Sequence, residues 1–468
     1  MLREKVNGSI SVFLAVSVTL VLSFCMVLIE SARENTLLLK ADIIFDAGLK
    51  SVMAEYSVPL WEKYDLLYVD CRYGSDRADF ELVKSHLAKY INKNLEYENS
   101  GWLSLEHTGT KITDVLLATD FNGKDFYLQA VQAGKASVGI SYLEQIKGWF
   151  DRVESTYSMG DYLESEMDSL NESIEEANDM EVEVKEAVWG TDINGDPVLL
   201  EEAEYEEVDI ENPLNQMLSG NILLRQVIED YDSISAVNIS LRELASHRKL
   251  AAGTMQDSRE ESNLWNKLFF SQYAMEHFSY YDGQTQGKGP LQCELEYLIG
   301  GKSSDTQNLE VVTAKLLILR EIDNYLLLLQ DELKKLEAHE IATAVTAALV
   351  PWLEPVVYQA LLIYWAYEES INDIAALFRG EAIPLVKSLP LELAENALLR
   401  YEDYLRILLL MQSRETLAMR SMDIIERSLR KEDAEFQMDA CIGQANVISE
   451  FYDSHDKQYE MSGSIQYY

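Results

Sequence analysis

The chain contains one stretch, Gly8–Ile29, of 22 residues without a charged side chain. As an α-helix rising about 1.5 Å per residue it would be about 33 Å long, which is enough to cross the hydrocarbon core of a bilayer. Arg3 and Lys5 precede it, and basic flanks tend to remain in the cytoplasm. We therefore expect a cytoplasmic stub at residues 1–7, a transmembrane helix in membrane lipid at residues 8–30, and the bulk of the chain outside the cytoplasm.

A cleaved secretory signal also begins with a short basic stretch, but its apolar part is usually about 7 to 15 residues long and is followed by a small-residue cleavage site. Here the apolar stretch is longer, and no A-x-A sequence follows it. We therefore favour a retained single-pass anchor in the cell membrane.

Helical periodicity continues beyond the apolar stretch. Apolar side chains recur at three- and four-residue spacing with charged residues between them, and Val58-Pro59 is expected to end the helix. Two interpretations remain open: one rod from residue 9 to about residue 57, which is the build of a pilin, or an anchor followed by a separate core helix. The apolar positions are Leu37, Leu38, Ala41, Ile44, Phe45, Gly48, Leu49, Val52, Met53 and Tyr56.

The next part of the chain alternates between strand and helix patterns. Trp61–Cys71 is rich in aromatic and β-branched residues and predicts a strand. Residues 76–96 have helical spacing, and Lys111–Phe121 predicts a second strand closed by the turn pair Asn122-Gly123. We expect residues 58–160 to form a small α+β head.

The chain is strongly acidic, with 39 Lys and Arg against 80 Asp and Glu and a formal net charge of −41. Such a chain is repelled by the phosphate backbone, so nucleic acid is not an expected partner. Residues 161–211 contain 20 acidic side chains and one basic one. Self-repulsion predicts that residues 161–215 are a solvated acidic spacer.

This spacer contains a sequence that superficially resembles a calcium-binding loop, starting at Asp192 and Asn194. Pro197 stands where the loop needs Gly, and Ala203 stands where it needs Glu. The segment is better explained as a β-hairpin with a type I′ turn at Asn194-Gly195.

Residues 216–468 are expected to form a mainly helical domain with a polar, Tyr-rich tail. Ser304 and Gln307 form a capping signature ahead of a helix from Asp305 to about Leu336. Residues 341–367 carry a single charge and are long enough for a second membrane crossing. Because Pro351 and Pro355 interrupt them, we favour two buried helices.

Few residues point to chemistry. The six histidines form no metal-binding pair, and no G-x-S-x-G nucleophile motif is present. We therefore expect no enzyme, no catalytic residue, no metal and no cofactor. His247-Arg248-Lys249 is a locally basic site that could meet the acidic segment. Cys71, Cys293 and Cys441 either stay buried thiols or form one disulfide outside the cytoplasm.

Several stretches carry a resemblance to a known family. They are the opening GSISVFLAV, AEYSVPLWEKYDLLYVD at 54–70, CELEYLIGGKSSDTQNLEVVTAKLLILRE at 293–321 and LRYEDYLRILLLMQ at 399–412. The chain resembles an uncharacterised family of bacterial membrane-anchored proteins, a domain of unknown function associated with the tight-adherence (Tad/Flp) pilus. Its N-terminus is similar to those of TadE/TadG pseudopilins, which implies a role in assembling or anchoring a fibre together with other pilus or envelope proteins.

The resemblance also implies a processing site. Prepilins are cut after a Gly, which here would separate Gly8 from Ser9, and the fifth residue of the new N-terminus is then Glu. In this chain that residue is Phe13, so either the cut does not occur or the chain does not polymerise like a major pilin.

The sequence as a whole predicts an α+β, predominantly helical protein. Its expected function is that of a single-pass, extracytoplasmic structural or assembly component of a Tad-like pilus. The alternatives are a membrane-anchored surface binding module, such as an adhesin or receptor, and a cell-envelope hydrolase.

Overall fold

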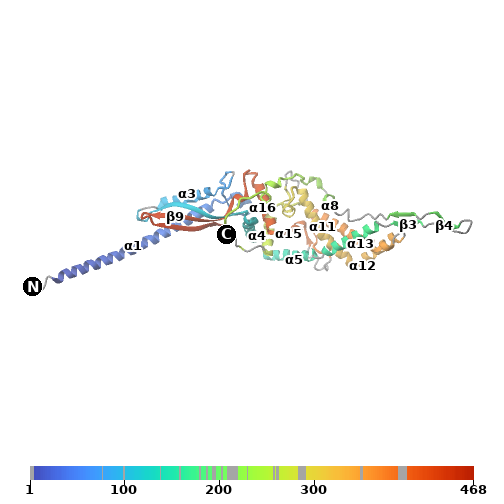
Figure 1. The fold of residues 1–468 in the computed structure, drawn as a ribbon, viewed down its shortest axis with the longest axis horizontal. Helices are drawn as coiled ribbons and strands as arrows, with labels where there is room; N and C mark the ends of the chain where they lie inside the picture. Colours follow the sequence, from blue (N-terminus) through green and yellow to red (C-terminus); the bar gives the residue numbers. More distant parts are fainter. Residues whose placement is uncertain are drawn as a thin grey trace. The chain divides into compact units, whose positions relative to one another are not determined.

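The structure is a computed structural model in which the fold is α+β and predominantly helical (Figure 1). Two compact units make up the chain: the first contains residues 1–130, 244–261 and 422–468, and the second contains residues 131–243 and 262–421. The described residues are 5–75, 77–98, 101–137, 139–157, 160–178, 181–185, 188–191, 197–201, 204–207, 220–228, 230–256, 259, 263–282, 291–347, 351–387 and 398–467.

The first unit begins with one continuous helix, α1 (Lys5–Met53), of 49 residues. Of the two interpretations left open, the structure has the single rod, which ends at Met53 rather than about residue 57 and is about 74 Å long at 1.5 Å per residue. Its most apolar window is not buried at all, and of the helices in the described ranges only this one is long and apolar enough to cross a membrane. Figure 1 shows the first half of α1 extending away from the sheet of its own unit. A signal sequence near the N-terminus can also be this long and apolar, so the helix is either an anchor or a signal.

The second half of α1 packs on a β-sheet. Buried side chains begin at Arg33 and recur every three or four residues, so that one stripe of the helix faces the sheet. Leu38, which the pattern also favoured, is instead 48% exposed. The buried apolar positions are Leu37, Ala41, Ile44, Phe45, Leu49 and Val52.

The sheet is antiparallel and is organised around β9 (Cys441–Asp453). β9 pairs with β2 (Leu105–Leu117), with β10 (Gln458–Gln466) and, through its first two residues, with the short β1 (Val69–Asp70). Strand β2 shifts register at three places, which are β-bulges or irregularities of the kind that re-aim and bend a strand. Helix α3 (Phe80–Glu98) packs against α1 and β2.

The expectation that the chain ends in a helical domain with a polar tail is wrong for its last residues. They form β9 and β10, and they complete the sheet of the first unit. Alternate residues of β9, including Ala445, Val447 and Phe451, are buried while those between are partly exposed. This two-residue alternation is the strand signal in the sequence, but the partner strand β2 lies more than 300 residues earlier in the chain.

The expected strand at Trp61–Cys71 is also corrected. Val58–Tyr64 forms the short helix α2, with Pro59 in its first turn, and only Val69–Asp70 is a strand. Proline fixes its backbone angle at a value that suits a helix start. The turn pair Asn122-Gly123 is confirmed as left-handed backbone at the start of α4 (Asp120–Ser137).

The second unit is built from helices. It has two hydrophobic cores. In one, α6 packs with α11, α12 and α13, and in the other, α5 packs with α9 and α15. Three short 3₁₀ helices are η1 (Gly101–Leu103) and η6 (Met438–Ala440) of the first unit and η3 (Leu241–Glu243) of the second. Helix α16 (Arg414–Leu429) lies near the end of the chain. The helical bounds of the second unit are α5 (Ile140–Tyr157), α6 (Gly160–Asn178), α8 (Gly220–Val227), η2 (Tyr231–Ser233), α9 (Leu264–His277), α10 (Glu294–Gly300), α11 (Asp305–Gln330), α12 (Glu332–Thr346), η4 (Pro351–Leu353), α13 (Glu354–Phe378) and α15 (Tyr401–Leu410).

The predicted long helix after Ser304 is confirmed at its start and ends earlier than expected. The Ser304 side chain accepts a hydrogen bond from the backbone N–H of Gln307, as an N-cap does. At Asp331 the chain begins a new helix, α12, because the Asp331 side chain accepts from the N–H groups of Leu333 and Lys334. Residues 341–367 are divided between α12 and α13, as the two prolines predicted. The expectation that both parts are buried is wrong, because Val345 is 65% exposed and Tyr364 is 43% exposed.

The acidic segment is not uniform. Its first part is α6, whose apolar residues Leu163, Leu170 and Ile174 are buried against α11 and α13, so this part packs rather than acting as a free spacer. The predicted hairpin is confirmed: β4 (Val188–Thr191) pairs with β5 (Pro197–Glu201). Its turn, at 192–196, lies outside the described residues. β3 (Glu181–Lys185) pairs with β6 (Glu204–Glu207), and β7 (Ile383–Pro384) with β8 (Leu398–Leu399).

Candidate functional site

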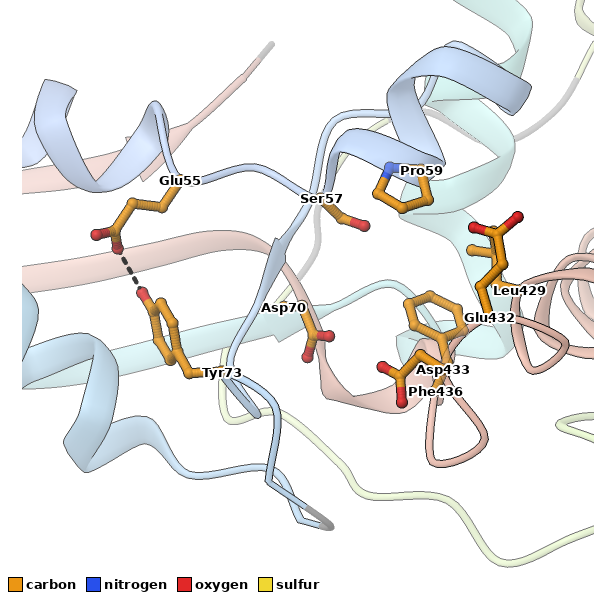
Figure 2. Close-up of a pocket in the computed structure, with 9 residues that line it drawn as sticks. All are labelled: Glu55, Ser57, Pro59, Asp70, Tyr73, Leu429, Glu432, Asp433 and Phe436. Atoms are coloured by element: carbon orange, nitrogen blue, oxygen red, sulfur yellow. Dashed lines mark hydrogen bonds between the residues drawn. The ribbon is translucent and has the colours of Figure 1, made fainter.

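A cavity of about 280 Å³ lies in the first unit, just beyond the end of α1 (Figure 2). In Figure 2, Glu55 and Tyr73 lie on one side of it, and Asp70, Glu432 and Asp433 lie toward the other. Its remaining lining residues are Ser57, Pro59, Leu429 and Phe436. Four carboxylates therefore surround a small, partly apolar space.

Glu55 is held by three side chains. Its carboxylate accepts hydrogen bonds from the hydroxyls of Tyr73 and Tyr90, at 2.7 and 2.6 Å, and lies 3.0 Å from Nδ1 of His86. Burial alone would raise the pKa of Glu55, but the hydrogen bonds from Tyr90, Tyr73 and His86 outweigh it, so the pKa lies below its ordinary value. The cluster ties the end of α1 to α3 and to the loop after β1.

The carboxylates on the other side are paired with basic side chains. Arg72, which is 1% exposed, lies 2.6 Å from both Asp70 and Asp433. The hydrogen bond from Arg72 is the main cause of the lowered pKa of Asp433. Lys63 reaches Glu432 at 2.6 Å. Each carboxylate of the cavity is thus already satisfied within the chain, which is typical of a structural clamp.

The carboxylates of the cavity are not grouped as the ligands of a metal ion. Across the part of the chain that the structure describes, no group of three or more His, Cys, Asp or Glu side chains is placed to hold a metal ion. The two predicted processing residues, Gly8 and Ser9, lie in the first turns of α1 and are not part of this cavity.

A second clamp joins α1 to the sheet where its buried stripe begins. The Arg33 guanidinium lies 3.0 Å from the Asp453 carboxylate and donates to the backbone carbonyl of Trp102 at 3.0 Å. Nearby, Lys457 pairs with Glu34 at 2.6 Å. Burial by itself would raise the pKa of Asp453, but two backbone N–H groups and Arg33 outweigh it and hold this pKa below its ordinary value.

Arg248, in the basic site at 247–249, binds acidic side chains of its own unit. Arg248 makes a bidentate pair with Glu426, at 2.6 and 2.7 Å, and contacts Asp439 at 2.5 Å. Glu426 is fully buried. Two segments far apart in sequence are joined by this pair, because a planar guanidinium matches a carboxylate in a fixed geometry.

The cysteines are free thiols in the structure. Cys71 and Cys441 come close along the β1–β9 ladder, where Asp70 is opposite Cys441. Neighbouring residues of a strand point to opposite faces, and Cys71 belongs to the core under α1 while Cys441 does not. Each thiol donates to a backbone carbonyl, Cys71 to Ala440 at 2.8 Å and Cys441 to Gln437 at 3.6 Å. Burial raises the pKa of Cys71 to about 12.

A family model matches residues 202–390 and 391–452, which together are more than half of the chain. The matching model describes a family of unknown function, DUF5702. The chain belongs to this family. No curated protein and no solved structure matches it. Membership in the family confirms that part of the resemblance which concerned a domain of unknown function, while the link to the Tad pilus and to TadE/TadG stays a prediction.

The match to DUF5702 begins after α1, so the apolar helix lies outside the matched residues. Sequence reasoning did not single out Arg33, Glu55 or Arg72, which form the two clamps. Arg33 stands on the same helical stripe as Leu37 and Ala41, and a charge in line with buried apolar residues is the signal that could have found it.

Proposed function

We propose that this chain is a membrane-anchored, extracytoplasmic structural or assembly component of a Tad/Flp-like pilus system, acting in the manner of a pseudopilin through protein contacts. The supporting observation is the division of α1. Its first half exposes apolar side chains from Ile10 to Ile29, and its second half is buried on an antiparallel sheet. A long helix that carries a folded head in this way is the build of a pilin.

The exposed half of α1 requires an apolar environment. Phe13 is 73% exposed and Met26 is 75% exposed, and such a surface is stable only in lipid or against other apolar helices. Arg3 and Lys5 orient the helix with its N-terminus in the cytoplasm, so that both folded units lie outside.

One face of this half is suited to helix packing. Ala15, Thr19 and Ser23 follow one another at four-residue spacing and line a shallow hollow. Small residues at this spacing allow helix backbones to approach closely in a membrane. Phe13 cannot form the ion pair that a glutamate makes in a major pilin, which favours a minor or assembly role. In this proposal the chain performs no catalytic step and binds no nucleic acid.

The proposal is tested in cells that encode the chain. Membrane fractionation, protease accessibility from outside and in-cell crosslinking are applied to the wild type and to Ala15→Leu/Thr19→Leu. The double variant is expected to stay in the membrane and to lose crosslinks to pilus components. Ser17→Leu, a small-to-large change on the opposite side of the helix, is the matched control and keeps the crosslinks.

Two results would overturn parts of the proposal. Full-length chain recovered with cytosolic markers contradicts the anchor. Anchored chain with no crosslink to any pilus component contradicts the assembly role and favours a surface binding module. The intact mass of the native protein shows separately whether residues 1–8 are removed.

A further inference from the structure

A groove of about 440 Å³ lies in the second unit between α11, α12 and α13. One wall is formed by Asp331, Lys334 and Glu337, which are spaced three residues apart. The facing wall is formed by Trp365, Glu368 and Asn372 of α13, at spacings of three and four residues. Both sets follow helical periodicity, so each presents a continuous stripe of side chains to the same space.

The groove is rich in hydrogen-bond acceptors. Its lining includes four carboxylates and one ammonium group, a formal charge of 1 − 4 = −3. Glu369 is paired with Lys387 at 2.7 Å and Glu337 with Lys334 at 2.8 Å. The exposed Glu368 and Asn372 have no partner among the described residues.

A buried acceptor in the groove is also unpaired. Asn324, which is 2% exposed, is one of the groove residues. Its Nδ2 donates to Ser370 at 2.9 Å and to Asp373 at 3.2 Å. Its Oδ1 has no donor within the described part of the chain. A buried acceptor without a donor costs free energy, and this atom is almost closed to solvent. A ligand that only donates would relieve this cost if its donor reached Oδ1 from the groove.

The chain itself already places a cation in this groove. The ammonium of Lys334 lies 5.1 Å from the centre of the Trp365 ring and 2.8 Å from Glu337. The Lys334 side chain is about half exposed, so it can move away at small cost. Its position marks the face of Trp365 on which a ligand cation would be attracted.

We propose that this groove binds an arginine side chain of a protein partner. A guanidinium is planar, stacks on Trp and offers five N–H donors with no acceptor, which fits Trp365, the free carboxylate of Glu368 and the unpaired Asn324. A neutral sugar would also stack on Trp365, but it gains nothing from the net negative charge. The inference deepens the proposed function, and it rests on that function only for the premise that the chain acts through protein contacts.

The test uses the full chain in detergent micelles, labelled with 5-fluorotryptophan. The ¹⁹F signal of Trp365, one of seven tryptophans, is assigned with Trp365→Phe. The probe is N-acetyl-arginine methylamide, and the equivalent citrulline compound is its neutral isostere. We expect the arginine probe to shift the Trp365 signal on saturation and the citrulline probe to bind at least about fivefold more weakly.

Matched variants separate a specific groove from general attraction to an acidic chain. Lys334→Met removes the resident cation and is expected to tighten binding of the arginine probe about threefold. The control is Lys335→Met, which changes the net charge by the same amount. Lys335 pairs with Glu332 and does not line the groove, so this variant should bind the arginine probe like the wild type. Glu368→Gln should weaken binding about threefold, whereas Glu340→Gln on α12 should not.

The proposal is overturned if Lys334→Met and Lys335→Met change the affinity equally, which would indicate non-specific attraction. It is also overturned if N-acetylglucosamine shifts the Trp365 signal and the arginine probe does not, because the groove would then be a sugar site. Since the purified chain is titrated, either failure is distinguishable from a failure of the membrane-assembly proposal.

Discussion

Arg33 of α1 and Asp453 at the end of β9 lie 3.0 Å apart, and their side chains are 1% and 0% exposed. Arg33 is the fourth residue after the apolar stretch that ends at Ile29. The change from exposed apolar helix to packed helix is therefore marked by a buried ion pair. In an anchored protein this pair would hold the sheet close to the end of the membrane segment.

Replacing Arg33 is expected to loosen this end of the sheet. Arg33→Met leaves the Asp453 carboxylate buried without its cation, which is unfavourable. We expect faster proteolysis at residues 454–457, between β9 and β10, measured by mass spectrometry of the fragments. The control is Lys50→Met, which removes an exposed pair with Asp46 on the same helix and should be cleaved at the wild-type rate. Equal cleavage rates for the two variants would contradict the clamp.

Replacing Arg248 is expected to destabilise the first unit strongly. Arg248→Met removes the bidentate partner of the fully buried Glu426 and leaves Arg430, at 2.9 Å, as its remaining cation. Because hydrogen bonds to a charged group are worth about 1.5–3 kcal/mol, we expect a loss of that order in the free energy of unfolding. Urea denaturation followed by circular dichroism measures the free energy of unfolding. The adjacent exposed Lys249→Met is the control and should change it by less than about 0.5 kcal/mol.

Glu296 in the second unit should make stability depend on pH. It is fully buried, and burial raises its pKa to about 7 from an ordinary value of 4.5. Because the folded-state pKa is the higher one, its contribution is complete below about pH 4.5 and is lost as the pH rises to about 7. The shift corresponds to a loss on the order of 3 kcal/mol across this window.

Glu296→Gln should flatten this dependence, as measured by urea denaturation at pH values from 4.5 to 8. Burial raises the pKa of Glu321 to about 7 as well and also raises the pKa values of Glu310 and Asp403. The single variant therefore keeps part of the slope, and Glu296→Gln/Glu321→Gln should reduce it further. An unchanged slope in the double variant would show that neither carboxyl is responsible.

Gly253 should not tolerate a side chain. A Cβ there would lie 2.2 Å from the carbonyl oxygen of Val115, a backbone atom that cannot easily move. Gly253→Ala should therefore lower the free energy of unfolding of the first unit by about 1–3 kcal/mol, measured by urea denaturation. Gly109→Ala, where a Cβ would meet nothing within 4 Å, is the control and should behave like the wild type.

The local elements of the chain could largely be predicted from its sequence. The apolar stretch, the cap at Ser304 and the strand pair β4–β5 follow from patterns within a few residues, because periodicity, capping and turn preferences are local properties. The same patterns left open whether the helix continues beyond the apolar stretch as one rod. The α2 helix was missed since aromatic residues favour strands only where a partner strand exists, and here Trp61 is 41% exposed on a helix.

The sequence by itself determined that one end of this chain is apolar enough for a membrane and that most of the rest is helical and acidic. Only the tertiary structure decided that Cys441–Gln466 completes the sheet under α1, that Arg248 binds Glu426, and that Glu55 meets Tyr73, His86 and Tyr90. These contacts join residues that are distant in the chain. Their partners are chosen by burial and charge compensation in the assembled fold, which no local pattern encodes.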